Sequence, residues 1–155
     1  MTGKGWDSMG GTLKDAMKVS KKSHKGKKDK IGKPQFDHPS RVMDSVDELN
    51  EKKVAIMHDV VEDTSTTLKD LRRYGFDVEI VEAVDAISRR DGERYFDYIG
   101  RVSNNELATK VKIADLLDNM HREHSSPEEK DGLMKRYRKA LRILTEVENK
   151  YWNYD

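Results

Sequence analysis

The chain has 155 residues, the size of one ordinary domain, and 38% of them are charged whereas 35% are apolar. A core built from so few apolar residues requires sharply amphipathic elements, which favours helices over a sheet. The net charge of +1 is too small to make a nucleic-acid polymer or an acidic membrane the default partner.

Cysteine is absent, which excludes disulfide bonds, thiolate metal sites and a cysteine nucleophile. The N-terminal residues lack the pattern of a signal peptide, and no stretch approaches the ~20 apolar residues that span a bilayer. These features predict a cytoplasmic protein with no membrane partner. They leave its oligomeric state undetermined.

The first segment of the chain, residues 1–11, contains four glycines and few side chains to bury. We therefore expect a flexible N-terminal arm, followed by a single domain over residues 12–155. A first helix is expected from about Leu13 to His24, and a lysine-rich loop then leads to Pro34.

A second helix is expected to open at His38-Pro39, because proline is tolerated in the first helical turn. Its apolar spacing continues as far as Leu49. The next segment, residues 51–63, has the composition of one continuous helix.

The later helices are marked by capping residues. These are Thr67 with Asp70, Asp77, Asn104 or Asn105, and Ser126 before Pro127. The spacing of apolar residues predicts helices that end before Gly75 and at about Ile87, Val102, Met120 and Tyr151, with Val78, Val81 and Val84 facing inward. No alternating stretch bounded by hairpin turns occurs, so the sequence predicts an all-α, single-domain fold.

The most informative segment reads His58-Asp59-Val60-Val61-Glu62-Asp63-Thr64. On a continuous helix, His58 would stack with Glu62, and Asp59 with Asp63. Burying several carboxylates together is costly unless a cation neutralises them, so the segment indicates either a bound metal or an exposed acidic face.

A second polar segment, Lys112 to Asn119, places Asp115 and Asn119 on one helix face. Asp118 falls inside the buried arc of the same helix and needs a partner. It is either a ligand or a carboxylate satisfied by lysine or arginine. His38, at the start of another helix, is a third group able to converge on an ion.

Basic residues are concentrated between Lys21 and Lys33, where seven lysines occur without an interleaved aromatic residue. Base stacking is therefore not offered by this loop, but flexible ammonium groups suit a polyphosphate ligand, and a solvated loop is the alternative. Five further side chains are suited to close the other side of a phosphate pocket: Arg89, Arg90, Tyr95, Tyr98 and Arg101.

The order of these motifs, His38-Pro39, then HDVVEDT, then KIADLLDN, resembles the HD-domain phosphohydrolases. Within them it is most similar to the hydrolase domain of RelA/SpoT-type enzymes, which degrade the alarmone (p)ppGpp, and the resemblance covers about residues 20–125. It implies an HD-type helical bundle and a metal, usually Mn²⁺, although another divalent transition metal would suit the same donors. The implied ligands are His38, His58, Asp59 and Asp115.

The resemblance also assigns roles to other side chains. Glu62 and Asp63 match the pair that orients and deprotonates the attacking water, and Asp63 is the preferred water-activating residue. Asn119 matches a nucleotide-contacting position. The expected contacts with substrate phosphates come from Lys28, Lys30, Arg89, Arg90 and Tyr98.

Several positions depart from the family pattern, among them Gln35-Phe36-Asp37 before the metal histidine. Asp29 stands where the relatives place a base-stacking arginine, and Leu116 and Asp118 replace an arginine and a histidine. We therefore expect metal-dependent hydrolysis of a phosphorylated nucleotide, by attack of water on a phosphate ester, with (p)ppGpp as the first substrate to test. The alternative is a metal- and nucleotide-binding module without catalysis, such as a sensor or an antitoxin-like partner.

Overall fold

A computed structural model describes residues 9–152, so residues 1–8 of the expected N-terminal arm and residues 153–155 lie outside the described chain. Within 9–152 the structure is helical, and its extended pairing is limited to an isolated bridge between Lys28 and Pro34. The all-α prediction is confirmed. No helix in this part of the chain is long and apolar enough to cross a membrane.

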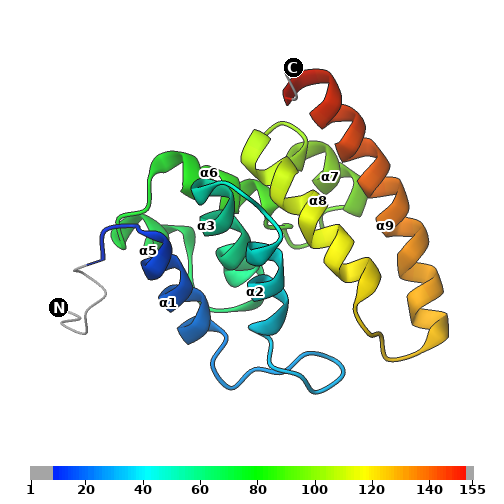
Figure 1. Ribbon diagram of the computed structural model, residues 1–155, viewed down its shortest axis with the longest axis horizontal. Coiled ribbons are helices and arrows are strands. Elements are labelled where there is room, and N and C mark those ends of the chain that lie inside the picture. The colour runs from blue at the N-terminus through cyan, green and yellow to red at the C-terminus, as the bar shows by residue number, and fades with distance from the viewer. Residues whose placement is uncertain (1–8, 153–155) are drawn as a thin grey trace.

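The helices are joined by loops, the longest of which covers residues 24–36 between the first two helices (Figure 1). They are α1 (Leu13–Ser23), α2 (Asp37–Asp44), α3 (Leu49–Met57), α4 (Val60–Asp63), α5 (Leu68–Arg73), α6 (Val78–Ile87), α7 (Tyr95–Val102), α8 (Glu106–His121), α9 (Pro127–Val147) and the π-helical turn η1 (Glu148–Trp152). The two longest, α8 and α9, run side by side in opposite directions at one edge of the molecule.

Helix α3 is the centre of the fold, because α1, α2, α6 and α8 all pack against it. Its last four residues, Val54 to Met57, are completely buried. The C-terminal turn of this helix, enclosed by its neighbours, has no polar face, which explains the unbroken apolar run from Val54 to Met57. The end of α3 is therefore inside the protein, and the residues that follow it, His58 and Asp59, are buried too.

Several predicted helix starts are confirmed by their hydrogen bonds. The Thr67 hydroxyl accepts from the Asp70 N–H at 3.1 Å as part of a capping box, and the Asn105 side chain accepts from Ala108 at 2.9 Å. Ser126 caps α9, with Pro127 in the first helical position. Local side-chain chemistry thus sets where these helices begin.

The prediction of one continuous helix over residues 51–63 is wrong, because the chain breaks at His58 and Asp59. The Ala55 carbonyl accepts a hydrogen bond from the His58 ring at 2.7 Å, which diverts it from the helical ladder. Asp59 has φ −115° and ψ 4°, outside helical geometry, and α4 starts at the next residue. This local hydrogen bond, together with the tertiary contacts of Asp59 with His24 and of His58 with Asp115, accompanies the break in the helical pattern.

Other boundaries also differ from expectation. Helix α2 ends at Asp44, and Leu49, 57% exposed, opens α3 instead of extending the buried stripe of α2. Val78, predicted to face inward, is 72% exposed because it lies in the first turn of α6, before the helix meets the core. Asp77 occupies the N-cap position of α6 but makes no side-chain capping hydrogen bond. Tyr151 is half-exposed because the π-helical turn after α9 rotates it off the apolar stripe.

The segment Met9 to Gly11, part of the expected N-terminal arm, lies against the turn at Gly75. Gly11 and Gly75 both have positive φ, 69° and 89°, and a Cβ on Gly11 would collide with the Gly75 carbonyl. Two glycines thus allow close approach of two backbones. This contact connects the start of the described chain to the loop between α5 and α6.

Replacing Gly11 with alanine is expected to lower the free energy of unfolding for two reasons. Alanine is strained at the positive φ of this position, and its Cβ would collide with the Gly75 carbonyl. Urea denaturation would measure the loss. Gly26→Ala is the matched control, since Gly26 also has positive φ (76°) but open space around its Cα. That control should cost only the conformational penalty of about 1–2 kcal/mol. Equal losses in the two variants would show that the contact of residues 9–11 with the turn contributes nothing.

Candidate functional site

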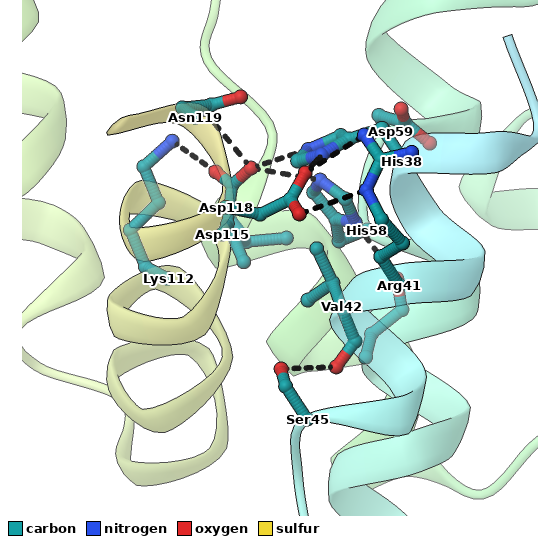
Figure 2. A network of polar contacts seen from close by, with 12 residues as sticks. His38, Arg41, Val42, Ser45, His58, Asp59, Lys112, Asp115, Asp118 and Asn119 are labelled. Atoms are coloured by element: carbon teal, nitrogen blue, oxygen red, sulfur yellow. Dashed lines mark hydrogen bonds and ion pairs between the residues drawn. The ribbon is translucent and has the colours of Figure 1, made fainter. Parts of the chain in front are cut away.

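Three polar side chains from three different elements meet in the interior: His38 from α2, His58 from the end of α3, and Asp115 from α8 (Figure 2). Asp115 Oδ1 lies 2.7 Å from His38 Nε2 and 3.3 Å from His58 Nε2. One potential ligand atom from each residue lies within 4.8 Å of the others. The ring centroids of the two imidazoles are 5.2 Å apart, and the ring planes are nearly perpendicular, at 77°.

The two imidazoles present the same nitrogen, Nε2, to this meeting point. Nδ1 of His58 donates to the Ala55 carbonyl at 2.7 Å, and Nδ1 of His38 lies 2.6 Å from a carboxylate oxygen of Asp118. Two imidazole nitrogens and a carboxylate oxygen are a donor set that suits a divalent transition metal, with positions left for water or substrate. The group fits a metal centre of the HD type.

Asp59, the fourth expected ligand, lines the same cavity but lies outside this group of three. Its Oδ1 contacts Nε2 of the buried His24 at 3.0 Å. Nδ1 of His24 is buried without a hydrogen-bond partner among the described residues. The sequence gives no sign of this contact, because 35 residues separate His24 from Asp59.

The charges around the centre are strongly coupled. Burial alone would lower the pKa of His58, but the carboxylates of Asp59 and Asp115 outweigh it and raise this pKa to about 9. Burial would raise the pKa of Asp115, but the Lys112 ammonium, 2.8 Å away, and His58 bring it well below its ordinary value. The site therefore holds an ionised carboxylate beside cationic groups in the interior.

Glu62 and Asp63, the expected catalytic pair, stand at the mouth of the same cavity. Although both side chains reach solvent, partial burial raises the pKa of each, and for Asp63 the nearby charge of Asp59 adds to the effect. One oxygen of Glu62 accepts the Arg89 backbone N–H at 2.6 Å. A carboxylate with a raised pKa is a better proton acceptor near neutral pH.

The cavity at the centre has a volume of about 180 Å³ and lies between two larger hollows. Through Gln35 and Arg122 it adjoins a hollow of about 400 Å³ between the lysine-rich loop and the start of α9. Through Glu62 and Asp63 it adjoins an open hollow of about 610 Å³ along residues 89–94. A substrate larger than one phosphate group thus has room on either side.

The expected substrate contacts are distributed between these spaces. Lys28 and Lys30 line the hollow beside α9, where Lys30 also approaches Glu129 at 3.4 Å. Asn119 lines the central cavity, donates to Asp115 Oδ1 at 3.2 Å, and leaves its own buried oxygen without a partner among the described residues. The roles of these residues toward a substrate stay predictions.

The expected contacts on the other side are mostly engaged with the protein itself. Arg90 pairs with Asp85 at 2.7 Å and donates to two backbone carbonyls, and Arg89 donates to the Glu93 carbonyl. Tyr98 lines the central cavity, but its hydroxyl donates to the Ile87 carbonyl at 2.5 Å. Burial raises the pKa of Tyr98 to about 12, so the phenol stays protonated.

Two residues at positions that depart from the family pattern have clear contacts. Asp29 accepts the N–H groups of Ile31 and Lys33 at 3.0 and 2.9 Å, so its carboxylate organises its own loop. Asp118 pairs with Arg41 at 2.9 Å, which confirms that a basic partner satisfies this carboxylate. Arg41 itself was not anticipated, although it stands three residues after His38 on the same helix face.

The fold and the His/His/Asp group define an HD-type helical domain, and comparisons with known proteins agree. The solved structure described as "A metazoan ortholog of SpoT hydrolyzes ppGpp and plays a role in starvation responses" superimposes with a TM-score of 0.66. The match covers 90% of this chain and 95% of that one, at 18% sequence identity, and so shows a shared fold.

Sequence relatives point to the same group. A "GTP pyrophosphokinase" of Streptomyces coelicolor is 31% identical over 125 residues, and a "Probable GTP pyrophosphokinase" of Mycobacterium leprae is 28% identical over 142 residues. These alignments cover 70% and 83% of this chain but only 14% and 18% of the relatives. No protein-family model matches the chain. The comparisons confirm the resemblance to a RelA/SpoT-type hydrolase domain.

Metal binding at this centre is expected to weaken as pH falls. In the metal-free protein His58 carries a proton below its pKa of about 9, and an ion that takes Nε2 must displace it. Affinity for Mn²⁺ should therefore drop about tenfold per pH unit below 9 and level off above it. Calorimetric titration from pH 6 to 10 would measure this, and His58→Ala should remove the binding at every pH. A pH-independent affinity would contradict the assignment of His58.

Proposed function

We propose that the protein is a metal-dependent phosphohydrolase of a phosphorylated nucleotide. The observation that carries the proposal is the convergence of His38, His58 and Asp115, with Glu62 and Asp63 at the mouth of the same cavity. The likeness in fold to a protein described as hydrolysing ppGpp supports the choice of substrate class. A site meant only for binding has no need of the two carboxylates with raised pKa.

The metal would be held by His38, His58 and Asp115, with Asp59 as the proposed fourth ligand and Mn²⁺ as the proposed ion. A divalent ion in such a site lowers the pKa of water and withdraws charge from a phosphate oxygen. The residues around it supply no thiolate, which favours a catalytic centre over a structural zinc site.

In the reaction, Asp63 accepts a proton from the attacking water as the water oxygen bonds to phosphorus. The bond between phosphorus and the ester oxygen breaks, and the leaving oxygen receives a proton from the Glu62 and Asp63 pair. The backbone hydrogen bond from Arg89 fixes the orientation of Glu62. Lys112, beside Asp115, contributes positive charge near the developing negative charge on the phosphate.

The rest of the nucleotide is proposed to occupy the hollow between the lysine-rich loop and α9. Its volume of about 400 Å³ is typical of small-molecule sites. Apolar surface from Ile31, Leu133 and Tyr137 is suited to a base or ribose, and basic groups are suited to phosphates. The basic residues are Lys28, Lys30, Arg122 and Arg136.

Arg136 is notable within this hollow because its guanidinium lies 4.0 Å from the ring centroid of Tyr95 while its buried Nε has no partner in the described chain. A buried donor without a partner is costly, and an anionic ligand group would satisfy it. With Asp29 committed to its own loop, base choice in this protein need not follow that of the alarmone hydrolases. The substrate (p)ppGpp is the first one to test.

The test is release of phosphate or pyrophosphate from a panel of 3′- and 5′-phosphorylated nucleotides, with Mn²⁺ and with a chelator. We expect metal-dependent turnover of at least one member, with kcat reduced about 10²–10⁴-fold in Asp63→Asn by loss of the proton acceptor. Asp131→Asn, at an exposed position of α9, is the matched control and should behave as the parent. No turnover of any nucleotide, or a fully active Asp63→Asn protein, would contradict the proposal.

The placement of the nucleotide has a separate test. Arg136→Met should raise KM for the substrate found in the panel and change kcat much less, because Arg136 binds a part of the substrate remote from the reacting bond. Arg138→Met, two residues further along α9 and exposed, should leave both constants unchanged. A loss confined to kcat in Arg136→Met would remove this hollow as the binding site.

A further inference from the structure

The His38 ring nitrogen that faces away from the shared point contacts the carboxylate of Asp118, and that carboxylate is paired with Arg41. His38 Nδ1 lies 2.6 Å from Asp118 Oδ2 (Figure 2). Arg41 Nε donates to Asp118 Oδ1 at 2.9 Å, and Arg41 Nη2 donates to Oδ2 at 3.1 Å. Such a two-point grip fixes a carboxylate in position and in plane.

The contact depends on matched spacing in two helices. His38 and Arg41 are three residues apart on α2, and Asp115 and Asp118 are three residues apart on α8, so each pair shares one helix face. His38 therefore touches both carboxylates, Asp115 through Nε2 and Asp118 through Nδ1. Both nitrogens of the ring are fixed, and the ring has no freedom to turn away from the centre.

We propose that Asp118 and Arg41 are positioning residues of the metal centre. Asp118 accepts the Nδ1–H of His38, which leaves Nε2 as the ring nitrogen available to an ion at the point shared with His58 and Asp115, and Arg41 holds the Asp118 carboxylate in place. This inference rests on the metal centre of the proposed function, but it does not depend on whether a nucleotide is hydrolysed.

The partners of the two imidazoles make the assignment specific. His58 donates Nδ1–H to a neutral backbone carbonyl, whereas His38 donates to a carboxylate. An ionised carboxylate is a stronger hydrogen-bond acceptor than a neutral carbonyl, and such a partner fixes the tautomer and the orientation of a metal-binding imidazole. The Arg41 side chain is 47% exposed, so its pairing with Asp118 contributes little to folding by itself.

The direct test is the affinity of the full chain for Mn²⁺, measured by calorimetry without any nucleotide. Asp118→Asn keeps an acceptor oxygen but loses the charge, and Asp118→Ala loses both, so affinity should fall from parent to Asn to Ala, about 10–100-fold overall. Arg41→Met should weaken binding less, since the carboxylate remains. Asp131→Asn and Arg138→Met, exposed on α9, are the matched controls and should bind as the parent does.

A second readout separates positioning from a purely structural role. With Co²⁺ in the site, the visible absorption spectrum reports the ligand geometry, and it should shift in Asp118→Ala but not in the controls. Thermal unfolding of the metal-free variants should stay close to that of the parent. Unchanged Mn²⁺ affinity in Asp118→Ala would overturn the inference. So would an affinity loss matched by unfolding of the metal-free variant, or a parent protein that binds neither ion.

Discussion

The architecture depends on one buried carboxylate, Asp115, whose oxygen meets two imidazole nitrogens within 3.3 Å. An ionised carboxylate in a protein interior is tolerated only when neighbouring charges compensate for lost hydration. His38, His58 and Lys112 provide that compensation from α2, the end of α3 and α8 itself. The charge compensation at the site therefore also constrains how these three helices pack, because moving one helix would leave a buried charge without a partner.

The location of the site follows from the central position of α3. Because the C-terminal turn of this helix is buried on all sides, its end delivers His58 and Asp59 to the interior, where water is scarce and charges interact strongly. The break in the helix then turns Glu62 and Asp63 toward the mouth of the cavity. A sheltered donor cluster is thereby joined to carboxylates that solvent and substrate can reach. This division suits a site that binds an ion inside and exchanges protons at its entrance.

The comparisons and the structure separate what is shared with relatives from what is particular to this chain. The helical frame superimposes on a solved structure over 90% of the chain despite 18% identity, as expected where packing constrains shape more than residue identity. The positions that depart from the family pattern have their own local roles. Asp29 orders the lysine-rich loop, and Asp118 joins α8 to α2 through His38 and Arg41. The proposed metal chemistry and a proposed change in base recognition are compatible, because the two depend on different side chains.

The sequence by itself determined the all-α class and most helix starts, since capping boxes such as Thr67 with Asp70 act within one turn and need no tertiary contact. It also singled out the three groups that converge, His38, His58 and Asp115, through motif order. Only the tertiary structure decided the break after α3, because it arises from the fit of His58 into the interior rather than from helix propensity. The same holds for contacts that join distant segments: His24 with Asp59, and Arg41 with Asp118 across 77 residues. Such pairs are set by how helices pack, and helix packing is a property of the whole chain that no local pattern contains.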